Sequence, residues 1–198
     1  MIKLVMEGLN LNIEKPQWVM IQGDNEEKLK QIVEILLGNS KEGLIEYTFN
    51  GIAVSSFSQR QLAAFRKKET INIFHNTFLV ENDTVERNFM LQLKFSGIYP
   101  TKAKRRVDQV INEYSLIDIR NKQISELSLL EKIKVRLIKA IIADPKLICG
   151  LWPSFEIKQV DLEEINQWIR RITNMGITVV FLLKNDQFIG YGDFVLSI

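Results

Sequence analysis

Residues 23–38, GDNEEKLKQIVEILLG, follow the apolar run Trp18–Ile21 after a single residue, Gln22. A phosphate-binding loop begins with a buried strand, a glycine and an amphipathic helix, because a helix N-terminus presents free backbone N–H groups to an anion. This chain has Glu26 and Lys28 where such a loop carries glycines. The stretch is a nucleotide site, a former nucleotide site or an ordinary strand-to-helix turn, and Asn25 is a good helix N-cap in each case.

Other residues with reactive side chains are isolated in the sequence. His75 is the only histidine, so it cannot build a nucleophile triad or a multi-histidine metal site by itself. We interpret it as a loop residue at an interface. Cys149 is the only cysteine and lies in an apolar run, which is typical of a small core residue. A disulfide within the chain is excluded, which suits a reducing compartment. We expect no metal centre.

The composition is that of a globular protein, with 46% apolar and 25% charged residues and a net charge of +2. So small a net charge gives no general argument for nucleic acid or anionic lipid as a partner. The basic run at 102–106 could contact phosphates, or it could be a solvated helix face. Apolar runs such as Ile177–Leu183 are far shorter than the roughly 20 residues of a spanning helix. Because no signal-peptide pattern follows Met1, we expect a cytoplasmic protein.

Hydrophobic periodicity predicts an alternation of strands and helices. Strands are expected at 9–14, 18–22, 44–54, 71–74, 146–151, 177–183 and 194–198. Helices are expected at 25–37, with Gly38 as the stop, and at 57–67, 84–95, 101–114, 128–143 and 159–173. Apolar strands joined by helices favour a parallel sheet, and the helical middle is expected to form a separate lobe inserted between two halves of that sheet.

Three further segments carry a family pattern in the correct order. They are FHNTFLVENDTVERN at 74–88, LSLLEKIKVRLIKAIIADPKLICGLWPS at 127–154, and GITVVFLLKN at 176–185. With the stretch at 23–38, they resemble the ATP-binding cassette (ABC) ATPases, most of all the branch that serves bacterial cell division and lipoprotein release. The resemblance rests on spacing over nearly the whole chain, with matches such as Gly23, Asn25, Asn88 and Ser128.

This resemblance implies an α/β fold: a P-loop NTPase-like (ABC ATPase) core with a mostly parallel sheet, plus an inserted helical subdomain. It implies a single ABC-ATPase-like domain over residues 1–198. The core lobe is expected at about 1–83 and 144–198, and the helical subdomain at about 84–143.

The side chains at the family's chemical positions have changed. In this register Leu29 replaces the P-loop lysine and Lys30 the hydroxyl residue, while Leu151 and Trp152 replace the two Walker B carboxylates. The switch histidine is Lys184, and His75 stands at the glutamine that senses the γ-phosphate. The signature glycines are Leu129 and Leu130, and Lys158 replaces the aspartate of the loop after Walker B. The hairpin that usually carries an adenine-stacking aromatic is expected to be largely missing. We therefore expect vestigial sites, no catalytic residue, and neither ATP nor Mg²⁺ as a cofactor.

The resemblance also implies partner proteins, which would bind to surfaces of this chain. Relatives of this branch pair head-to-tail and dock on a membrane permease-like subunit through a groove beside the glutamine loop. Here that groove would be lined by His75, Phe78, Leu79 and Val80, with Phe89 and Met90 nearby. We favour a pseudo-ATPase: a scaffold or regulator at the inner face of the cell membrane that pairs with an ABC ATPase, docks on a membrane subunit, or does both. Two alternatives stay open. One is an ATP-binding ABC transporter subunit with impaired hydrolysis, and the other is a cytoplasmic protein- or nucleic-acid-binding module.

Overall fold

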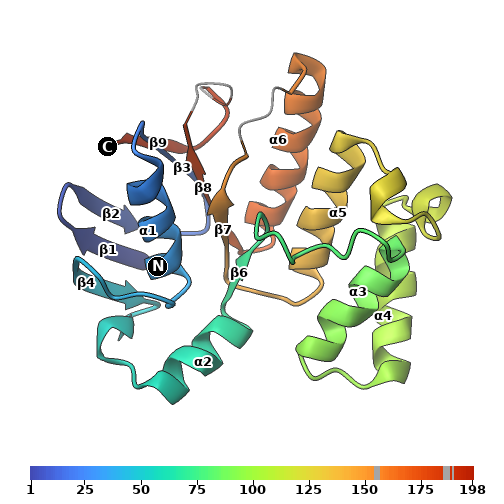
Figure 1. Ribbon diagram of the computed structural model, residues 1–198, viewed down its shortest axis with the longest axis horizontal. Helices are drawn as coiled ribbons and strands as arrows, with labels where there is room; N and C mark the ends of the chain where they lie inside the picture. The colour runs from blue at the N-terminus through green and yellow to red at the C-terminus, as the bar shows by residue number, and fades with distance from the viewer. Residues whose placement is uncertain (154–156, 185–187, 189) are drawn as a thin grey trace. The chain divides into compact units, whose positions relative to one another are not determined.

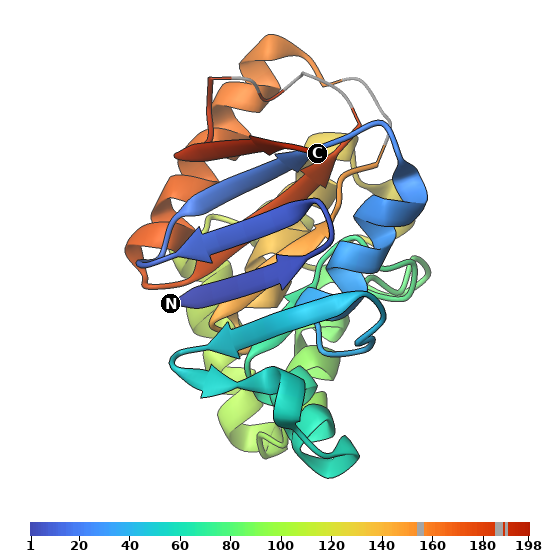
Figure 2. The same ribbon diagram turned by 90° about the vertical axis from the view of Figure 1, so that its left-hand side faces the viewer.

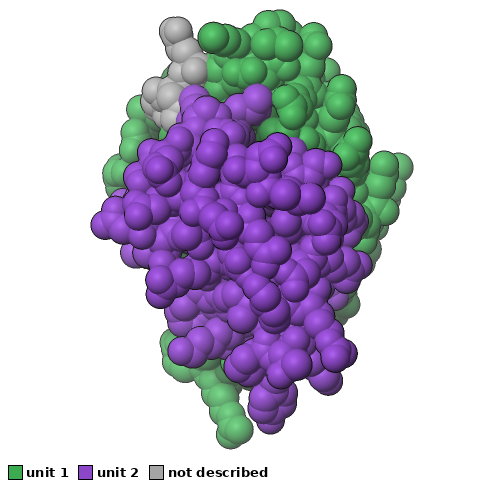
Figure 3. Space-filling model, turned by 90° about the vertical axis from the view of Figure 1, so that its right-hand side faces the viewer, with its two compact units in different colours: residues 1–74, 145–198 green, residues 75–144 purple. Residues whose placement is uncertain are grey.

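The computed structural model describes residues 1–153, 157–184, 188 and 190–198. Ser154 and Asn185, the last residues of two of the family-like segments, lie outside the described residues. The chain divides into two compact units, coloured separately in Figure 3. Unit 1 comprises Met1–Phe74 and Pro145–Ile198, and unit 2 comprises His75–Asp144.

A parallel sheet of five strands forms the centre of unit 1 and has the order β6-β7-β8-β3-β9 (Figure 2). The strands are β3 (Trp18–Gln22), β6 (Thr70–Asn72), β7 (Leu147–Leu151), β8 (Thr178–Leu183) and β9 (Phe194–Ser197). Every residue of β8 is buried, as expected for a strand covered on both faces. The mixed α/β class with a parallel sheet is confirmed.

Helix α1 (Glu26–Leu36) links β3 to the second sheet of the unit (Figure 1). Its buried positions recur at helical spacing, at Leu29, Ile32, Val33, Ile35 and Leu36. They share one core cluster with side chains of the parallel sheet and of the second sheet, so α1 is packed between the two layers. Gly38 has a φ of +75°, the left-handed conformation that ends many helices. The predicted glycine stop is confirmed.

The second sheet is antiparallel, with the order β2-β1-β4-β5. Its strands are β1 (Ile2–Met6), β2 (Leu9–Ile13), β4 (Leu44–Phe49) and β5 (Ile52–Ala53). Strands β1 and β2 form a hairpin in which Ile2 lies opposite Ile13 and Met6 opposite Leu9. The expectation that a hairpin is largely missing here was wrong, because five residues before the turn at Glu7–Gly8 are enough to pair. The hairpin contains no aromatic residue.

The remaining elements of unit 1 are the short 3-10 helix η1 (Val54–Ser56) and the helices α2 (Gln59–Lys68) and α6 (Gln159–Asn174). Helix α2 begins with a capping box, in which Ser58 Oγ accepts from the backbone of Gln61 and the Gln61 side chain accepts from the backbone of Ser58. Helix α6 packs on β8 and β3.

Unit 2 is helical and has its own apolar core. It contains α3 (Val85–Phe95), α4 (Pro100–Glu113), η2 (Ile117–Ile119), η3 (Ile124–Glu126) and α5 (Leu129–Ile141). Phe89, Val107 and Val135, one from each long helix, are completely buried in that core. Within the described part of the chain, none of the helices has the length and apolar character needed to cross a bilayer.

Candidate functional site

The turn between β3 and α1 is three residues long, from Gly23 to Asn25. Two backbone N–H groups at the turn and in the first turns of α1 have backbone partners within the chain. The N–H of Gly23 donates to the Leu183 carbonyl at 3.1 Å, and the N–H of Leu29 donates to the Asn25 carbonyl at 3.0 Å. Asn25 caps the helix, since its Oδ1 accepts from the backbone N–H of Lys28 at 3.1 Å. The turn is an ordinary capped helix start.

The backbone of this turn lacks the shape that holds a phosphate. A phosphate-binding nest alternates right- and left-handed residues so that successive N–H groups converge on one anion. In the fully described stretch 23–30, no residue has a positive φ. Leu29, at the family's lysine position, is completely buried in the core of unit 1. At the position of the family's phosphate-binding lysine, this chain therefore has an apolar side chain that packs into the core.

A carboxylate of the chain itself lies at the start of α1. Glu26 pairs with Lys184 at 2.9 Å and with Lys30 at 2.9 Å. The hydrogen bond from Lys184 is the main reason that the pKa of Glu26 falls to about 2, and Lys30 adds to the effect. A negative side chain in the first turn also interacts favourably with the helix dipole. Glu26, Lys30 and Lys184, which stand at three positions of the family's nucleotide site, thus form one cluster of ion pairs.

Lys28 turns to the other side of α1, toward the β1–β2 hairpin. Its Nζ lies 2.8 Å from the position that a Cβ on Gly8 would occupy. It lines a polar hollow of about 710 Å³ together with the carboxyl-bearing residues Glu7, Glu27 and Glu42. Three carboxylates around one ammonium give this hollow a net negative charge, which repels a triphosphate.

Trp152 follows β7 at the position of the family's catalytic glutamate. Its backbone N–H donates to the Leu182 carbonyl at 2.8 Å, and only 3% of the residue is exposed. Its ring lies 4.5 Å from that of Phe188, 4.8 Å from Phe74 and 5.3 Å from Phe181, measured between centroids. Such edge-on and tilted contacts between rings are favourable. The interpretation that Trp152 fills a vacated cavity agrees with this packing.

The described residues at the end of β7 consequently offer no ligands for a metal. Leu151 is half-buried and apolar, and the rings around Trp152 present carbon atoms. Among the residues that the structure describes, no group of three or more histidine, cysteine, aspartate or glutamate side chains could hold a metal ion. Cys149 is fully buried, and burial raises the pKa of its thiol far above the usual range. The interpretation of Cys149 as a core residue fits both observations.

The signature-like stretch is a helix start in unit 2. Ser128 Oγ accepts from the Glu131 N–H at 3.2 Å, and a Glu131 carboxylate oxygen accepts from the Ser128 N–H at 2.8 Å. This capping box holds the first turn of α5, on which Leu129 is exposed and Leu130 half-buried. Lys158 belongs to unit 1, in which it is the exposed N-cap of α6.

The segment 75–80 opens unit 2 and carries the proposed partner-binding residues. His75 and Val80 are exposed and Phe78 is half-buried, but only 3% of Leu79 is exposed. Phe89 is completely buried as well. The expectation that Leu79 and Phe89 line a docking groove was wrong, because both side chains belong to the core of unit 2. His75 Nδ1 lies 2.9 Å from Thr77 Oγ1, which fixes its ring on the surface.

Two buried polar side chains, Asn88 and Lys139, hold the segment 75–80. The sequence analysis did not predict this role for either residue. Asn88 accepts from the Val80 N–H at 2.9 Å and donates to the Val80 carbonyl at 3.1 Å. The Lys139 ammonium donates to the Phe78 carbonyl, lies 3.2 Å from Asn88 Oδ1 and lies 5.0 Å from the centre of the Phe78 ring. Burial lowers the pKa of Lys139 to about 8. The position of Lys139 among apolar residues of α5 was the feature of the sequence from which its burial could have been predicted.

The basic run at 102–106 is partly neutralised on α4. Lys104 pairs with Glu86 and lies 3.9 Å from Asp108. Arg120 forms two further hydrogen bonds with Glu86, at 2.8 and 2.9 Å. These contacts favour the interpretation of the run as a solvated helix face.

Comparison with known proteins gives one consistent family. The family described as "ABC transporter" matches residues 6–150. An uncharacterized ABC transporter ATP-binding protein, YknY of Bacillus subtilis, is 24% identical over 92% of this chain and 80% of its own length. The lipoprotein-releasing system ATP-binding protein LolD of Bacteroides fragilis is 25% identical over 92% of this chain and 85% of its own.

Solved structures show the same fold. The ATP-binding cassette MJ0796, determined as a dimer bound to ADP and Pi, superposes with a TM-score of 0.79 at 19% identity and covers 100% of this chain and 94% of its own. CbiO1 from Clostridium perfringens, part of the ABC transporter complex CbiONQ, superposes with a TM-score of 0.80 at 17% identity, covering 96% of this chain and 76% of its own.

Proposed function

The chain belongs to the ABC transporter family, and we propose that within this family it is a non-catalytic subunit, a pseudo-ATPase that acts as a scaffold or regulator. It would dock on a membrane permease-like subunit, and it would dimerise either with a second copy of itself or with an active ABC ATPase. Two relatives named as ATP-binding proteins of a transporter and of a lipoprotein-releasing system support an assembly of this kind.

The observation that carries the proposal is the ion pair between Glu26 and Lys184 at the start of α1. A nucleotide-binding loop needs free backbone N–H groups and a lysine that reaches the phosphates. Here the carboxylate of Glu26 lies at the start of α1, and Lys184, which follows β8, is paired with it. An entering phosphate would have to separate this pair and accept repulsion from Glu26 and Glu27.

The surroundings of Trp152 support the absence of hydrolysis independently. Hydrolysis in this family requires a carboxylate that orients Mg²⁺ and another that activates water. The residues at these two positions are Leu151 and Trp152, and the indole is packed among aromatic rings. A bound nucleotide would therefore lack a general base at this position.

We further propose that units 1 and 2 are the core lobe and the helical subdomain of one ABC-type domain. The proposed location is cytoplasmic and peripheral, at the inner face of the cell membrane, with the segment 75–80 as the contact to a membrane subunit. His75, Phe78 and Val80 would supply the contact, and Leu79 would anchor the segment from within unit 2.

The decisive experiment is a thermal-shift and calorimetric titration of the purified chain with Mg-ATP and Mg-ADP, combined with a phosphate-release assay. A ligand at about 100 times its dissociation constant stabilises a protein by about 2.7 kcal/mol, a readily measured shift. We expect no shift at millimolar nucleotide and no phosphate release. Saturable binding at micromolar nucleotide would overturn the pseudo-ATPase proposal.

An ATP-binding subunit with impaired hydrolysis is the second candidate. Its support is the Lys28 ammonium beside the start of α1, and the net negative charge of the hollow of about 710 Å³ that Lys28 lines opposes it. The same titration separates the two candidates. If nucleotide binds, Lys28→Ala and Lys30→Ala identify which ammonium has taken the role of the missing lysine, since loss of one phosphate contact weakens binding by about tenfold or more.

The partner surface can be tested by site-specific photocrosslinking in cells. A photoreactive amino acid in place of Val80 is expected to crosslink to a membrane protein with several spanning helices. The matched control replaces Ile117, which is 64% exposed in the same unit but lies outside the segment 75–80. Equal crosslinking from both positions, or crosslinking from Val80 to nucleic acid alone, contradicts the proposed docking and supports the third alternative, a binding module without a membrane partner.

A further inference from the structure

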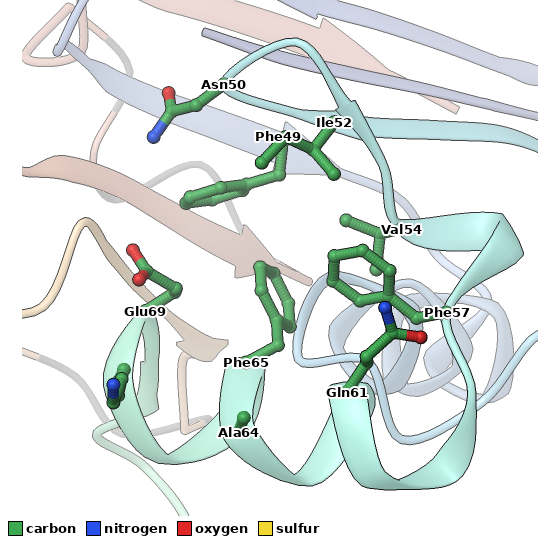
Figure 4. Close-up of a pocket in the computed structure, with 10 residues that line it drawn as sticks. Phe49, Asn50, Ile52, Val54, Phe57, Gln61, Ala64, Phe65 and Glu69 are labelled. Atoms are coloured by element: carbon green, nitrogen blue, oxygen red, sulfur yellow. The ribbon is translucent and has the colours of Figure 1, made fainter.

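An apolar cavity of about 310 Å³ lies in unit 1 between the antiparallel sheet and helix α2. Figure 4 shows the rings of Phe49, Phe57 and Phe65 around a common space. Phe65 is the central ring, with its centroid 5.0 Å from that of Phe49 and 6.1 Å from that of Phe57, both edge-on. Val54 and Ile52 complete the apolar wall. This volume is at the lower end of the range for small-molecule sites.

The walls of the cavity are fixed by contacts that leave its interior open. Lys41 donates to the carbonyls of Ser55 and Phe57, at 2.6 and 3.0 Å, and so holds the segment that carries Phe57. Phe49 and Phe65 are each only 5% exposed. By contrast Ile52, on the two-residue strand β5, is 58% exposed and lies at the opening. A preformed apolar space with an exposed apolar edge favours an apolar group that enters from solvent.

The polar residues at the cavity define the other end of a ligand. Asn50 Oδ1 accepts from the Met1 amine at 2.8 Å, so its amide N–H groups are the part left to donate. Gln61 Oε1 is likewise occupied in the capping box of α2, at 2.8 and 2.9 Å from Ser58. Within the part of the chain that the structure describes, the side chains of Lys68 and Glu69 have neither a hydrogen-bond nor an ion-pair partner. In Figure 4, Asn50 and Glu69 lie at one end of the space and Gln61 at the other.

From this arrangement we propose that the cavity is a binding site for a small zwitterion with one apolar group, of the chemical class of a free amino acid with an aromatic or branched side chain. The apolar group would lie in the cavity and pack against the rings of Phe49, Phe57 and Phe65 that line it. The carboxylate would accept from Lys68 and the Asn50 amide, and the ammonium would donate to Glu69. A ligand with only a negative charge would be repelled by Glu69, and one with only a positive charge by Lys68. A zwitterionic group therefore matches the charges of the site best. The site is separate from the nucleotide question and does not depend on the proposed function.

The test is a titration of the isotopically labelled full chain, followed by ¹H–¹⁵N NMR, with phenylalanine as the probe. Leucine is a second probe, glycine carries the head group alone, and N-acetylphenylalanine amide carries the ring with an uncharged, peptide-like head. We expect saturable shifts at the cavity with phenylalanine and leucine at millimolar concentrations, and none with glycine. Absence of saturable shifts with both apolar amino acids overturns the proposal.

The chain offers matched variants for each part of the site. Ala64 lines the cavity on an exposed face of α2, whereas Ala63 is exposed next to it and does not. Ala64→Phe is expected to fill the space and weaken binding at least about tenfold, while Ala63→Phe leaves it unchanged. Equal binding by both variants overturns the assignment of the cavity.

Variants that remove one charge from the cavity test whether it binds the charged groups of the ligand. Lys68→Gln and Glu69→Gln are each expected to weaken phenylalanine binding by about three- to tenfold, and Lys67→Gln, one residue away and outside the cavity, leaves it unchanged. Tighter binding of N-acetylphenylalanine amide than of phenylalanine would overturn the zwitterion. It would show instead that the cavity accepts an apolar side chain of a peptide.

Discussion

The ammonium nitrogen of Lys184 lies 2.9 Å from a carboxylate oxygen of Glu26, and the two residues are 158 positions apart in the chain. The sheet explains the contact. Strands β3 and β8 pair in parallel with Gln22 opposite Leu183, so the residues that follow each strand emerge at the same edge. The carboxyl ends of parallel strands are where α/β proteins usually bind ligands. In this chain that edge carries an internal ion pair.

The ion pair predicts a dependence of stability on acid pH. The pKa of Glu26 falls from its usual 4.5 to about 2 in the folded chain, so its contribution is fully present above pH 4.5 and is lost as the pH falls toward 2. We expect Glu26→Gln to be less stable than the native chain at pH 6 and to approach it at pH 2. Denaturant unfolding across this range measures the difference. Glu27→Gln is the control, because the side chain of Glu27 is 86% exposed and pairs with Lys30 at 3.3 Å. A constant difference between Glu26→Gln and the native chain would contradict the prediction.

Trp152 predicts a large loss of stability on truncation. Replacing a buried tryptophan by alanine removes apolar contacts and leaves a cavity, at a cost of about 3–5 kcal/mol. We therefore expect Trp152→Ala to lower the free energy of unfolding by that amount, with Trp152→Phe losing clearly less because a ring still contacts Phe74 and Phe188. Chemical denaturation measures both. A cost below about 1 kcal/mol for Trp152→Ala would mean that the indole does not fill this space.

Much of the fold follows from local sequence pattern. The buried strand β3 matches its predicted bounds, because four apolar residues and Gln22 precede a glycine. Helix α1 follows from its apolar spacing, its Asn25 cap and the stop at Gly38. The antiparallel sheet was not predicted as a separate layer, because β1 pairs with β4 through residues far apart in the sequence, such as Ile2 and Phe49.

The candidate site was less predictable than the fold. The sequence register identified the positions of Glu26 and Lys184 but not their pairing, which depends on the register of β3 and β8. It also assigned Leu79 to a surface, since an apolar residue in a polar loop is equally typical of a docking face and of an anchor into the core. Only the packing of Leu79 with the helices of unit 2 distinguishes the two.

Lys139 predicts a rise in stability at alkaline pH. Its pKa is lowered from 10.5 to about 8 by burial, so the unfolded chain binds more protons than the folded chain between these values. The contribution of this group to the free energy of unfolding therefore increases as the pH rises from 8 to 10.5. Lys139→Met removes it, and the difference between variant and native chain should change across this interval in urea denaturation. Lys94→Met, an exposed lysine of the same unit, is the control. If both variants show the same pH dependence, Lys139 is not the titrating group.

Asn88 predicts that one amide determines the conformation of the segment 75–80. Its side chain is completely buried and satisfies the N–H and the carbonyl of Val80 while also accepting from Lys139. Asn88→Ala removes the partner of the Val80 N–H, whereas the Val80 carbonyl still accepts from the Asp83 N–H at 3.1 Å. A loss of about 1–3 kcal/mol is therefore expected. Amide exchange of Val80 should accelerate together with that loss. Asn112→Ala, which removes one exposed hydrogen bond to the Asp108 carbonyl, should cost less than about 1 kcal/mol. Unchanged exchange at Val80 in Asn88→Ala would show that the segment is held by the Leu79 anchor alone.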